Sequence, residues 1–388
     1  MRKETLVTHP GIITTPTDNP PFVQPIYQSV KFHFSSLEEL ENARVGKREG
    51  YFYSRVANPT LRQLELLLAK LQDRDDALVT NTGVSAIALC LLSFLAKDDH
   101  VVTFVQSYTP IRFLIRKLLG KFGVTCTLAD VRDIESLERA IVPGRTKMII
   151  IESPTNPTTR ICDLDRVLAI AKKHQVITVL DNTFAGFHNH GKYAFDLYLH
   201  SLTKFASGHG DVMGGAVIGS KSLLDSMRSN YAHLGPALDP HAAFLIARGM
   251  NSYFVRYEKQ CENALKIANF LAERKQVIRL LYPGLPSHPD HALAKRQMSD
   301  FGSIITLDLD GGKAQLRTFL DSLKLFSVSF SLGSTESLAA PAKLFYAGDL
   351  SEAEQQIAEI TPATVRLSIG LESVDDLNAD LEQALEKI

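Results

Sequence analysis

The chain has 388 residues, of which 45% are hydrophobic and 22% are charged, and its formal net charge at pH 7 is −1. A chain of this length and composition can bury a large core, and we expect two or three domains. The balanced charge, without a long run of one sign, argues against nucleic acid and anionic membranes as partners.

The sequence predicts neither export nor a membrane span. No apolar run follows the first residues, and the longest apolar window, residues 86–96, is shorter than the roughly 20 residues that cross a bilayer. The four cysteines are far apart and show no CxxC spacing, so neither a disulfide framework nor a zinc site is expected. This cysteine usage fits a reducing cytoplasm.

The first 55 residues are a poor start for a self-contained core, because they are rich in proline and threonine and then polar. The prolines are Pro10, Pro16, Pro20, Pro21 and Pro25. The segment is either a disordered tail or an extended arm that packs on another subunit. Ser36 followed by Glu39 predicts the capped start of a short helix.

An aromatic and arginine cluster follows. Tyr53 and Arg55 precede the sequence Asn58-Pro59-Thr60, and leucines at helical spacing predict a helix over residues 61–71. Arg55 is either an ordinary surface charge or a phosphate ligand, because the guanidinium fork matches phosphate oxygens.

The next unit is a strand over residues 77–80, a turn at Asn81-Thr82-Gly83 and an apolar helix over residues 84–96. The N-terminus of such a helix presents free N–H groups and the positive end of the helix dipole to an anion. Many buried α/β units share the pattern, so the turn by itself is only a weak indication of an anion site.

Strands and helices then alternate. Strands are predicted over residues 100–106, 124–128, 147–151, 176–180, 195–200 and 214–219, and helices over 111–119, 134–141 and 164–174. The strands are rich in Val and Ile without alternation, which is typical of a mainly parallel sheet covered by helices on both faces. Ligands bind at the carboxyl ends of such strands, which places Tyr108, residues 152–157, 181–184 and 201–204 at one rim.

Two ionisable residues stand at these strand ends. Lys204 lies between a buried strand and a Gly-rich turn, where desolvation can lower the pKa of its amine enough for attack on an aldehyde. Asp181 directly follows the strand over 176–180 and is a candidate ligand for Mg²⁺, for a ribose or for a protonated ring nitrogen. A second carboxylate at metal-site spacing and an early GxGxxG are both missing, so the ring-nitrogen role is favoured.

The pattern changes after about residue 250. Helices are predicted over residues 252–274, 315–323 and 374–388, and strands over 277–282, 301–309 and 364–370, with a loop over 329–338. These elements predict a smaller α+β domain with an antiparallel sheet. Arg366 lies in the last strand, and on pattern alone a surface ion pair is the competing interpretation.

Five motifs occur in order along the chain. They are Tyr53-Ser54-Arg55 with Asn58-Pro59-Thr60, Glu152-Ser153-Pro154-Thr155-Asn156-Pro157, Asp181-Asn182-Thr183-Phe184, His200-Ser201-Leu202-Thr203-Lys204, and Ser331-Leu332-Gly333 with Glu336-Ser337-Leu338. With them the chain resembles, over almost its whole length, the Cys/Met-metabolism group of pyridoxal 5′-phosphate (PLP) enzymes. That group contains the cystathionine synthases and lyases and the methionine γ-lyases.

The resemblance implies an α/β chain of PLP-dependent transferase fold type I, the aspartate-aminotransferase fold. It implies a mainly parallel, seven-stranded-type sheet sandwiched by helices and a smaller C-terminal α+β domain. The expected parts are an N-terminal arm (residues 1–55) that contacts the neighbouring subunit, a large PLP-binding domain (56–250) and the C-terminal domain (251–388). A cytoplasmic homotetramer, built as a dimer of dimers with active sites shared across the dimer, is implied as well.

The resemblance also implies roles for individual residues. Lys204 would hold PLP covalently and then move protons as base and acid, and Asp181 would pair with the ring nitrogen. Tyr108 would stack on the ring and assist at the leaving group. The phosphate would be bound by Gly83, Val84, Ser201 and Thr203, and by Tyr53 and Arg55 of a neighbouring subunit. Arg366 would bind the substrate α-carboxylate. Asn156 and Ser331 would line the site beside the phenolic oxygen of the cofactor, this carboxylate and Lys204, which makes Asn156 a cofactor-binding residue as well. No metal is expected.

The chain departs from the family pattern in three places, of which the first two change the pocket wall. Thr109-Pro110-Ile111 replaces small residues after Tyr108, residues 185–191 replace the usual continuation after Phe184, and Asn81-Thr82 replaces a serine-rich turn. His188 and His190 in the second segment are interpreted as loop or interface residues. Phe330 stands where a glutamate often binds the distal amino group of the substrate, and it favours an apolar or differently held distal group.

The sequence therefore predicts a PLP-dependent carbon–sulfur lyase of transsulfuration, acting at Cβ or Cγ of cystathionine or a related sulfur amino acid. The alternatives within the same scaffold are a cystathionine γ-synthase, an O-acyl-homoserine sulfhydrylase and a methionine γ-lyase. A non-catalytic PLP-binding subunit is the alternative from another class, and the intact set of Lys204, Asp181, Tyr108 and Arg366 argues against it.

Overall fold

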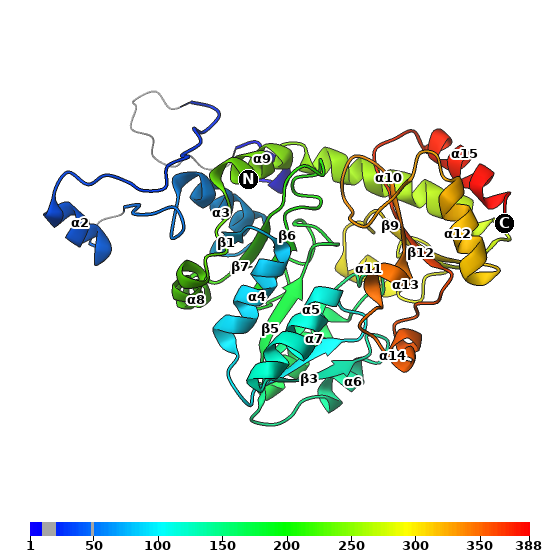
Figure 1. The fold of residues 1–388 in the computed structure, drawn as a ribbon, viewed down its shortest axis with the longest axis horizontal. Coiled ribbons are helices and arrows are strands. Elements are labelled where there is room, and N and C mark those ends of the chain that lie inside the picture. The colour runs from blue at the N-terminus through cyan, green and yellow to red at the C-terminus, as the bar shows by residue number, and fades with distance from the viewer. Residues whose placement is uncertain (10–20, 48–49) are drawn as a thin grey trace.

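The computed structural model describes residues 1–9, 21–47 and 50–388, and it contains two β-sheets enclosed by helices (Figure 1). The larger sheet has the strand order β1-β7-β6-β5-β4-β2-β3. Its strands are β1 (Asp76–Thr80), β2 (His100–Phe104), β3 (Thr125–Ala129), β4 (Thr146–Glu152), β5 (Ile177–Asp181), β6 (Leu197–Ser201) and β7 (Gly215–Gly219). Neighbours from β3 to β6 are parallel, and only β7 runs antiparallel, to β1 and β6. The prediction of a mainly parallel seven-stranded sheet is confirmed.

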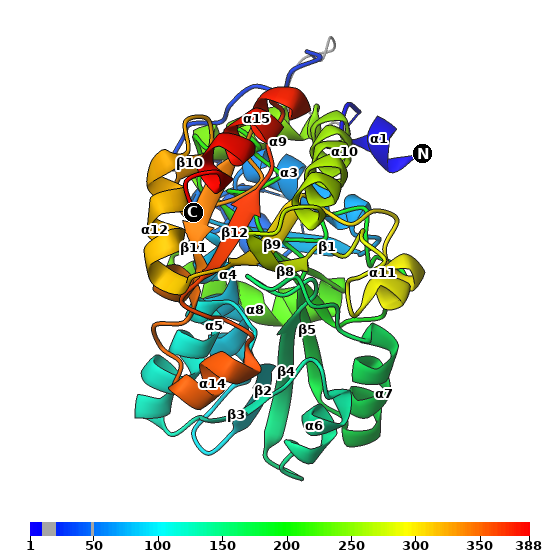
Figure 2. The same cartoon turned by 90° about the vertical axis from the view of Figure 1, so that its right-hand side faces the viewer.

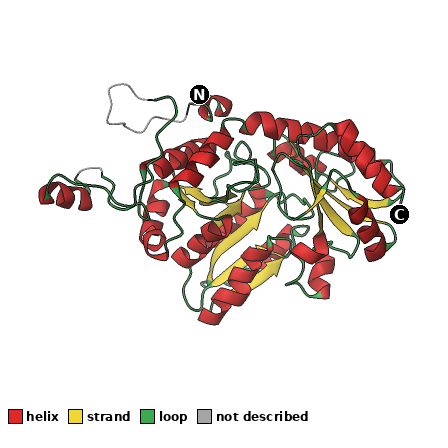
Figure 3. Cartoon of the chain, turned by 45° about the horizontal axis from the view of Figure 1, so that its top comes forward, coloured by secondary structure: helices red, strands yellow, loops and turns green. Residues whose placement is uncertain are grey.

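Helices cover both faces of this sheet, which explains why its strands are apolar throughout (Figure 3). In β4, Ile149 and Ile151 belong to the core on one face, whereas Met148 and Ile150 belong to the core on the other. The first core is closed by α3 (Pro59–Leu71), α6 (Ile134–Arg139), α7 (Leu164–His174) and α9 (Pro240–Met250). The second is closed by α4 (Gly83–Phe94), α5 (Thr109–Phe113), the π turn η1 (Leu114–Leu118) and α8 (Lys221–Leu234).

Four of the nine predicted helices begin at residues whose side chains cap them. The side chain of Asn58 accepts a hydrogen bond from the Thr60 amide at 2.9 Å at the start of α3, and Asp163 caps α7 in the same way. Helices α8 and α9 were not predicted, although Ser220 and Asp239 cap them. The helix predicted over 111–119 ends at Phe113 and continues as η1 and the 3₁₀ turn η2 (Leu119–Phe122).

The smaller sheet has the order β10-β11-β12-β9-β8. Its strands are β8 (Val277–Leu281), β9 (Ile304–Leu309), β10 (Ser327–Val328), β11 (Leu338–Pro341) and β12 (Thr364–Ser368). All its pairs are antiparallel except β10 with β11. Helices α10 (Tyr253–Ala272), α12 (Gly312–Ser322) and α15 (Val374–Leu385) cover one face (Figure 2). The prediction missed β10 and β11 and the short helices α11 (His291–Gln297), α13 (Ala342–Tyr346) and α14 (Glu352–Ile357).

The other face of the smaller sheet is turned towards the larger sheet. In β12, Val365 and Leu367 enter the helix-covered core, so the alternation of a strand places Arg366 on the opposite face. There its guanidinium reaches Asn156, which lies in the loop after β4. The two sheets thus face each other across the predicted ligand rim.

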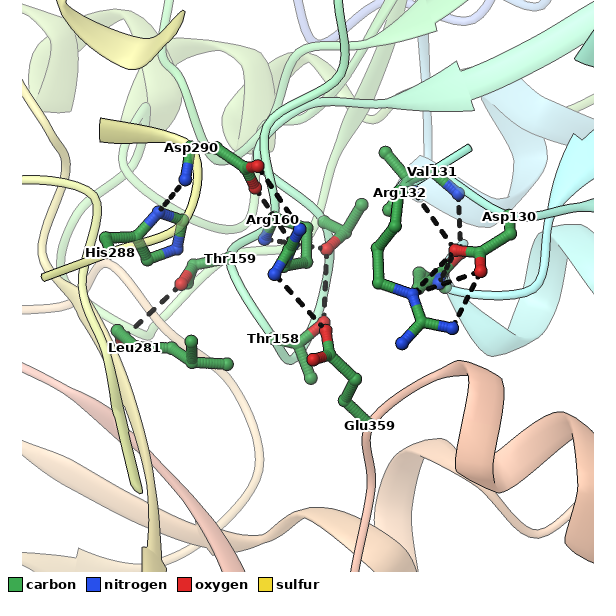
Figure 4. Close-up of polar contacts among 12 residues, drawn as sticks. Asp130, Val131, Arg132, Thr158, Thr159, Arg160, Leu281, His288, Asp290 and Glu359 are labelled. Carbon is green, nitrogen blue, oxygen red and sulfur yellow. Dashed lines mark hydrogen bonds and ion pairs between the residues drawn. The ribbon is translucent and has the colours of Figure 1, made fainter. Parts of the chain in front are cut away.

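An ion network fixes the loop after β4 against the smaller sheet. Figure 4 shows the Arg160 side chain between the carboxylates of Asp290 and Glu359. The Nε–Oδ2 distance to Asp290 is 2.9 Å, the Nη1–Oε2 distance to Glu359 is 3.6 Å, and only 9% of the Arg160 side chain is exposed. The Thr306 hydroxyl also donates to the Pro157 carbonyl at 2.5 Å. These contacts hold Asn156 in place between the sheets.

The N-terminal part of the chain runs outward from the body, with α2 (Leu37–Arg44) at its far end (Figure 1). The helix begins where predicted, and the Ser36 hydroxyl accepts from the Glu39 amide at 3.1 Å. The apolar side chains of Phe22, Val23 and Val30 are exposed. Residues 10–20, with Pro10, Pro16 and Pro20, and residues 48–49 lie outside the described residues. The contact of the arm with another subunit and the domain boundaries at residues 55 and 250 stay predictions.

Candidate active site

A cavity of about 340 Å³ opens where the carboxyl ends of β4, β5 and β6 meet the smaller sheet. Its lining includes the predicted site residues Gly83, Val84, Tyr108, Asn156, Asp181, Ser201, Thr203, Lys204, Phe330, Ser331 and Arg366. It also includes residues to which no role was assigned from the sequence, such as Thr183, Met213 and Tyr346. Tyr53 and Arg55 do not line it.

Lys204 follows β6 in a tight turn, in which its amide donates to the Ser201 carbonyl at 3.2 Å. Its Nζ donates to the Ser331 hydroxyl at 2.8 Å. Burial lowers the pKa of the Lys204 amine to about 8, and the positive charge of Arg366 contributes in the same direction. A substantial fraction of this amine is therefore neutral, and nucleophilic, near neutral pH.

Asp181 ends β5. Its Oδ1 accepts two hydrogen bonds from Thr183, one from the amide at 3.1 Å and one from the hydroxyl at 2.6 Å. Oδ2 receives no hydrogen bond from the described residues. Burial raises the pKa of Asp181 from its ordinary value, whereas the two bonds from Thr183 oppose the rise. A carboxylate with one oxygen held and the other open to the cavity suits a cationic N–H donor.

Glu152 is a second buried carboxyl beside Asp181, because the two residues are register partners at the ends of β4 and β5. The Asn156 amide donates to its Oε1 at 2.6 Å. Burial, and next the charge of Asp181, hold the pKa of Glu152 well above its usual range. Burial and the nearby charge of Asp181 thus both disfavour ionisation of Glu152.

The N-terminus of α4 forms one end of the cavity. The Thr82 hydroxyl accepts from the Ser85 amide at 3.0 Å, whereas the amides of Gly83 and Val84 have no acceptor among the described residues. A Cβ added at Gly83 would lie 2.9 Å from the Ser201 Cβ, so only glycine allows the helix to come this close to β6. Free amides at the start of a 12-residue helix, beside the Ser201 and Thr203 hydroxyls, suit a phosphate.

Arg366 closes the opposite end. Its side chain is buried, and no carboxylate of the described residues lies within ion-pair distance, so the surface ion pair considered from the sequence is wrong. Its Nη1 donates to Asn156 Oδ1 at 3.0 Å and its Nη2 to the Ser331 carbonyl. Ser331 has a φ of 137°, which is rare for any residue but glycine, so backbone strain is located at this site. A buried guanidinium without an anion suits a ligand carboxylate.

Two tyrosines lie beside Arg366. Tyr108, directly before α5, was predicted as a site residue and lines the cavity. Burial, and next the charge of Asp181, raise the pKa of its phenol to about 12. Tyr346, at the end of α13, was missed because it lies in no motif. The Arg366 Cζ stands 4.7 Å from the centroid of the Tyr346 ring. Only the packing of the smaller sheet reveals this contact.

Phe330 stands at the mouth of the cavity with 65% of its surface exposed, and its ring centroid lies 5.2 Å from that of Phe345. Tyr53 and Arg55 lie outside the cavity of their own chain: the Arg55 guanidinium packs over the Tyr53 ring at 5.5 Å and donates to the Ala232 carbonyl. From these positions the two residues do not reach the cavity of their own chain. A contact with a cofactor would therefore have to be made in the cavity of another subunit.

The histidines of the unusual segment after Phe184 have protein partners. His188 pairs with Asp300, and His190 Nδ1 lies 2.7 Å from Asn182 Oδ1. In the part of the chain that the structure describes, no group of three His, Cys, Asp or Glu side chains could hold a metal ion. In the same part, no helix is long and apolar enough to cross a bilayer.

The residues of the cavity fit PLP. Free amides and hydroxyls at α4 suit its phosphate, the open oxygen of Asp181 suits its ring nitrogen, and the partly neutral amine of Lys204 suits its aldehyde. The buried Arg366 remains for the carboxylate of an amino acid.

Comparison with known proteins agrees with this fit. The model of the family described as Cys/Met metabolism PLP-dependent enzyme matches residues 4–386. An L-methionine gamma-lyase of Fusobacterium nucleatum subsp. polymorphum is 39% identical over 94% of this chain and 93% of its own length. A cystathionine gamma-lyase of Bacillus subtilis is 37% identical over the full length of both chains.

Solved structures show the same fold. The crystal structure of a cystathionine gamma synthase from Xanthomonas oryzae pv. oryzae, in complex with aminoacrylate and cysteine, superposes with a TM-score of 0.93 and 34% identity. The superposition extends over 100% of this chain and 98% of the Xanthomonas chain. The prediction of fold type I is confirmed.

Proposed function

The chain belongs to the family of Cys/Met metabolism PLP-dependent enzymes, and on that premise we propose that it is a carbon–sulfur lyase. It eliminates at Cβ or Cγ of a sulfur amino acid, with cystathionine as the first candidate. The observation that carries the proposal is the meeting of Lys204, Asp181 and Arg366 in one cavity. Bound PLP supplies the electron sink that makes the Cα proton of an amino acid removable.

In this proposal each end of the cavity binds a different group. The amides of Gly83 and Val84 and the hydroxyls of Ser201 and Thr203 bind the phosphate of PLP. Asp181 Oδ2 would accept from the ring nitrogen and keep it protonated, and Tyr108 would supply an aromatic ring for stacking on the cofactor. The support is the lack of any protein partner, among the described residues, for the Gly83 and Val84 amides and for Asp181 Oδ2.

The substrate binds by its α-carboxylate to Arg366, with Asn156 and Ser331 holding the guanidinium from two sides. The Lys204 Nζ takes the proton from the substrate Cα. Loss of this proton alone allows a substituent at Cβ to leave, whereas removal of a second proton, from Cβ, allows a substituent at Cγ to leave. Tyr108, which is protonated near neutral pH, can donate to the leaving sulfur.

The distal end of the substrate meets Phe330, whose ring packs against that of Phe345. Neither ring offers a charge to an amino group, which favours an apolar or differently held distal group and speaks against a straightforward γ-synthase. The second candidate function is γ-replacement on an activated homoserine, and a methionine γ-lyase is the third. A role as a non-catalytic PLP-binding subunit is disfavoured by the intact Lys204.

Four incubations of the holoenzyme test the proposal: with cystathionine, with methionine, with cysteine, and with O-succinylhomoserine plus cysteine. Pyruvate from cystathionine means β-elimination, 2-oxobutyrate means γ-elimination, and newly formed cystathionine means γ-replacement. Lys204→Ala is the control, and it should form no product and lack the absorption band of the bound cofactor. A wild-type protein without product in all four incubations would refute the substrate class.

We also propose a cytoplasmic homotetramer in which Tyr53 and Arg55 reach the phosphate in a neighbouring subunit. The support is the position of both residues outside their own cavity, the exposed apolar side chains of the N-terminal arm, and the exposed Val84, Met213 and Phe330 around the cavity. The four cysteines are unpaired, which fits a reducing compartment.

A further inference from the structure

The guanidinium of Arg366 is held from three sides. Its Cζ lies over the Tyr346 ring, 4.7 Å from the ring centroid, and its two terminal nitrogens donate to Asn156 and Ser331. The buried Nε has no hydrogen-bond partner among the described residues. Two parallel hydrogen bonds to a carboxylate require the guanidinium to stay in one plane. The Tyr346 ring limits movement of the guanidinium, because a cation loses attraction when it leaves its position over an aromatic face.

Tyr346 is in turn held by Arg112, a residue of α5 that is 1% exposed. Arg112 Nη2 donates to the Tyr346 carbonyl at 2.9 Å, and the Thr109 hydroxyl reaches the same carbonyl at 3.3 Å. The Arg112 guanidinium also forms a bidentate ion pair with Asp349, three residues after Tyr346, at 2.6 and 2.9 Å. The ion pair therefore fixes the end of α13 against α5.

Arg112 fixes the other tyrosine as well. Its Nη1 donates to the carbonyls of Val105, at 3.1 Å, and Ser107, which precede Tyr108 in the chain. One buried cation thus sets the distance between the segment that carries Tyr108 and the segment that carries Tyr346. Val105, Tyr346 and Leu350, from the segments on both sides of Arg112, belong to one small apolar cluster.

We propose that Tyr346 is a positioning residue for the carboxylate-binding Arg366, and that the Arg112–Asp349 ion pair holds Tyr346 in this position. The inference rests on the proposed function, in which Arg366 binds the α-carboxylate of the substrate. It adds two determinants of amino-acid affinity that lie in no sequence motif.

Two substitutions at Tyr346 separate the ring from the hydroxyl. Tyr346→Phe keeps the aromatic face on Arg366 and should leave the affinity for amino acids within about 3-fold of wild type. Tyr346→Leu removes the face and should weaken the affinity roughly 5- to 30-fold, the range that corresponds to a desolvated cation–π contact of about 1–2 kcal/mol. KM should rise by the same factor with little change in kcat, since ground state and transition state share the carboxylate contact.

The affinity is measured on the holoenzyme with two probes, by the change in the visible absorption of the bound cofactor. L-alanine carries an α-carboxylate and no leaving group, whereas O-methylhydroxylamine is an amine without a carboxylate. A positioning role predicts weaker binding of L-alanine to Tyr346→Leu and an unchanged reaction with O-methylhydroxylamine. Equal losses with both probes, or no loss with L-alanine, would overturn the proposal.

The ion pair is tested with Asp349→Asn, which keeps the shape of the side chain and removes its charge. It should weaken L-alanine binding in the same direction as Tyr346→Leu. Combining the two substitutions should add little further loss, because both act through the same ring. Fully additive losses would refute the link between Asp349 and Tyr346.

A matched control is available on the same pair of segments. Arg116 Nη1 lies 3.2 Å from Glu354 Oε1, so Arg116→Gln also removes an ion pair between the larger sheet and the segment after α13, but one without contact to Tyr346. L-alanine binding should stay at the wild-type level in this variant. If instead Arg116→Gln weakens binding as much as Asp349→Asn, a general loosening of the segment explains the loss and the proposal is wrong.

These measurements separate the inference from the function on which it rests. A wild-type enzyme that forms no product from any sulfur amino acid, but binds L-alanine more tightly than Tyr346→Leu does, would refute the lyase alone. An active wild-type lyase whose Tyr346 and Asp349 variants bind L-alanine normally would refute the inference alone.

Discussion

The lowered pKa of the Lys204 amine can be tested by measuring how this one side chain reacts at different pH values in the cofactor-free protein. Burial is the larger cause and the Arg366 charge the smaller, and together they lower the pKa of the amine from 10.5 to about 8. At pH 8 about half of a group with this pKa is neutral, compared with about one in 300 of a lysine at its ordinary value. Only the neutral amine reacts with an acylating reagent or an aldehyde.

The assay is brief acetylation of the cofactor-free protein with acetic anhydride at a series of pH values, with mass spectrometry of the peptide that contains Lys204. We expect the extent of modification to rise through a midpoint near pH 8. In Arg366→Gln the midpoint should move upward and stay below 10.5, because the repelling charge is gone and the burial remains. Arg116→Gln, on the surface of the larger sheet, is the control and should leave the midpoint unchanged.

Two results would contradict this physical account. A wild-type midpoint near 10.5 would mean that water reaches the amine freely and that the cavity does not desolvate it. A downward shift in Arg366→Gln would mean that the charge of the arginine does not raise the free energy of the protonated amine. Either result would remove the reason for expecting Lys204 to react at neutral pH without a separate base.

Three further predictions concern the cofactor. Asp181→Asn should lower kcat about 100- to 1000-fold at unchanged protein stability, the usual loss of a preorganised electrostatic group; a kcat within 10-fold of wild type would refute its role at the ring nitrogen. Gly83→Ala places a Cβ 2.9 Å from the Ser201 Cβ and should weaken PLP binding by about 1–3 kcal/mol, whereas Gly120→Ala, which meets only ordinary contacts, should not. Arg55→Ala should weaken PLP retention in the oligomer, measured by dialysis; unchanged PLP affinity on dilution to monomers would argue against the cross-subunit contact.

The positions of Lys204 and Asp181 followed from the sequence because of a property of parallel sheets. Each residue ends an apolar run, and parallel strands bring their carboxyl ends to the same edge. No knowledge of the packing of helices is needed for that conclusion. The same reasoning placed residues 152–157 at the edge, although it did not identify the effect of burial on Glu152.

Helices were predicted well where an apolar stripe and a cap coincide, as in α3 and α7. Helices α8 and α9 were missed although Ser220 and Asp239 cap them. The segment 114–122 was predicted as the continuation of a helix, but it winds into π and 3₁₀ turns before Gly123, whose φ is +86°. Local winding of this kind depends on how η1 packs on β3, which the periodicity of apolar residues does not report.

The amino-acid sequence was sufficient to predict the family, the sheet type and the residues at the strand ends, because these depend on local apolar patterns and on motifs of adjacent residues. The surroundings of Arg366 could be found only from the packing of the two sheets. Its neighbours Asn156 and Tyr346 come from the loop after β4 and from α13, and Tyr346 is held by Arg112, 234 residues earlier in the chain. Contacts between residues of two different sheets do not depend on the apolar periodicity of either segment. They can therefore be identified only once the packing of the two sheets is known.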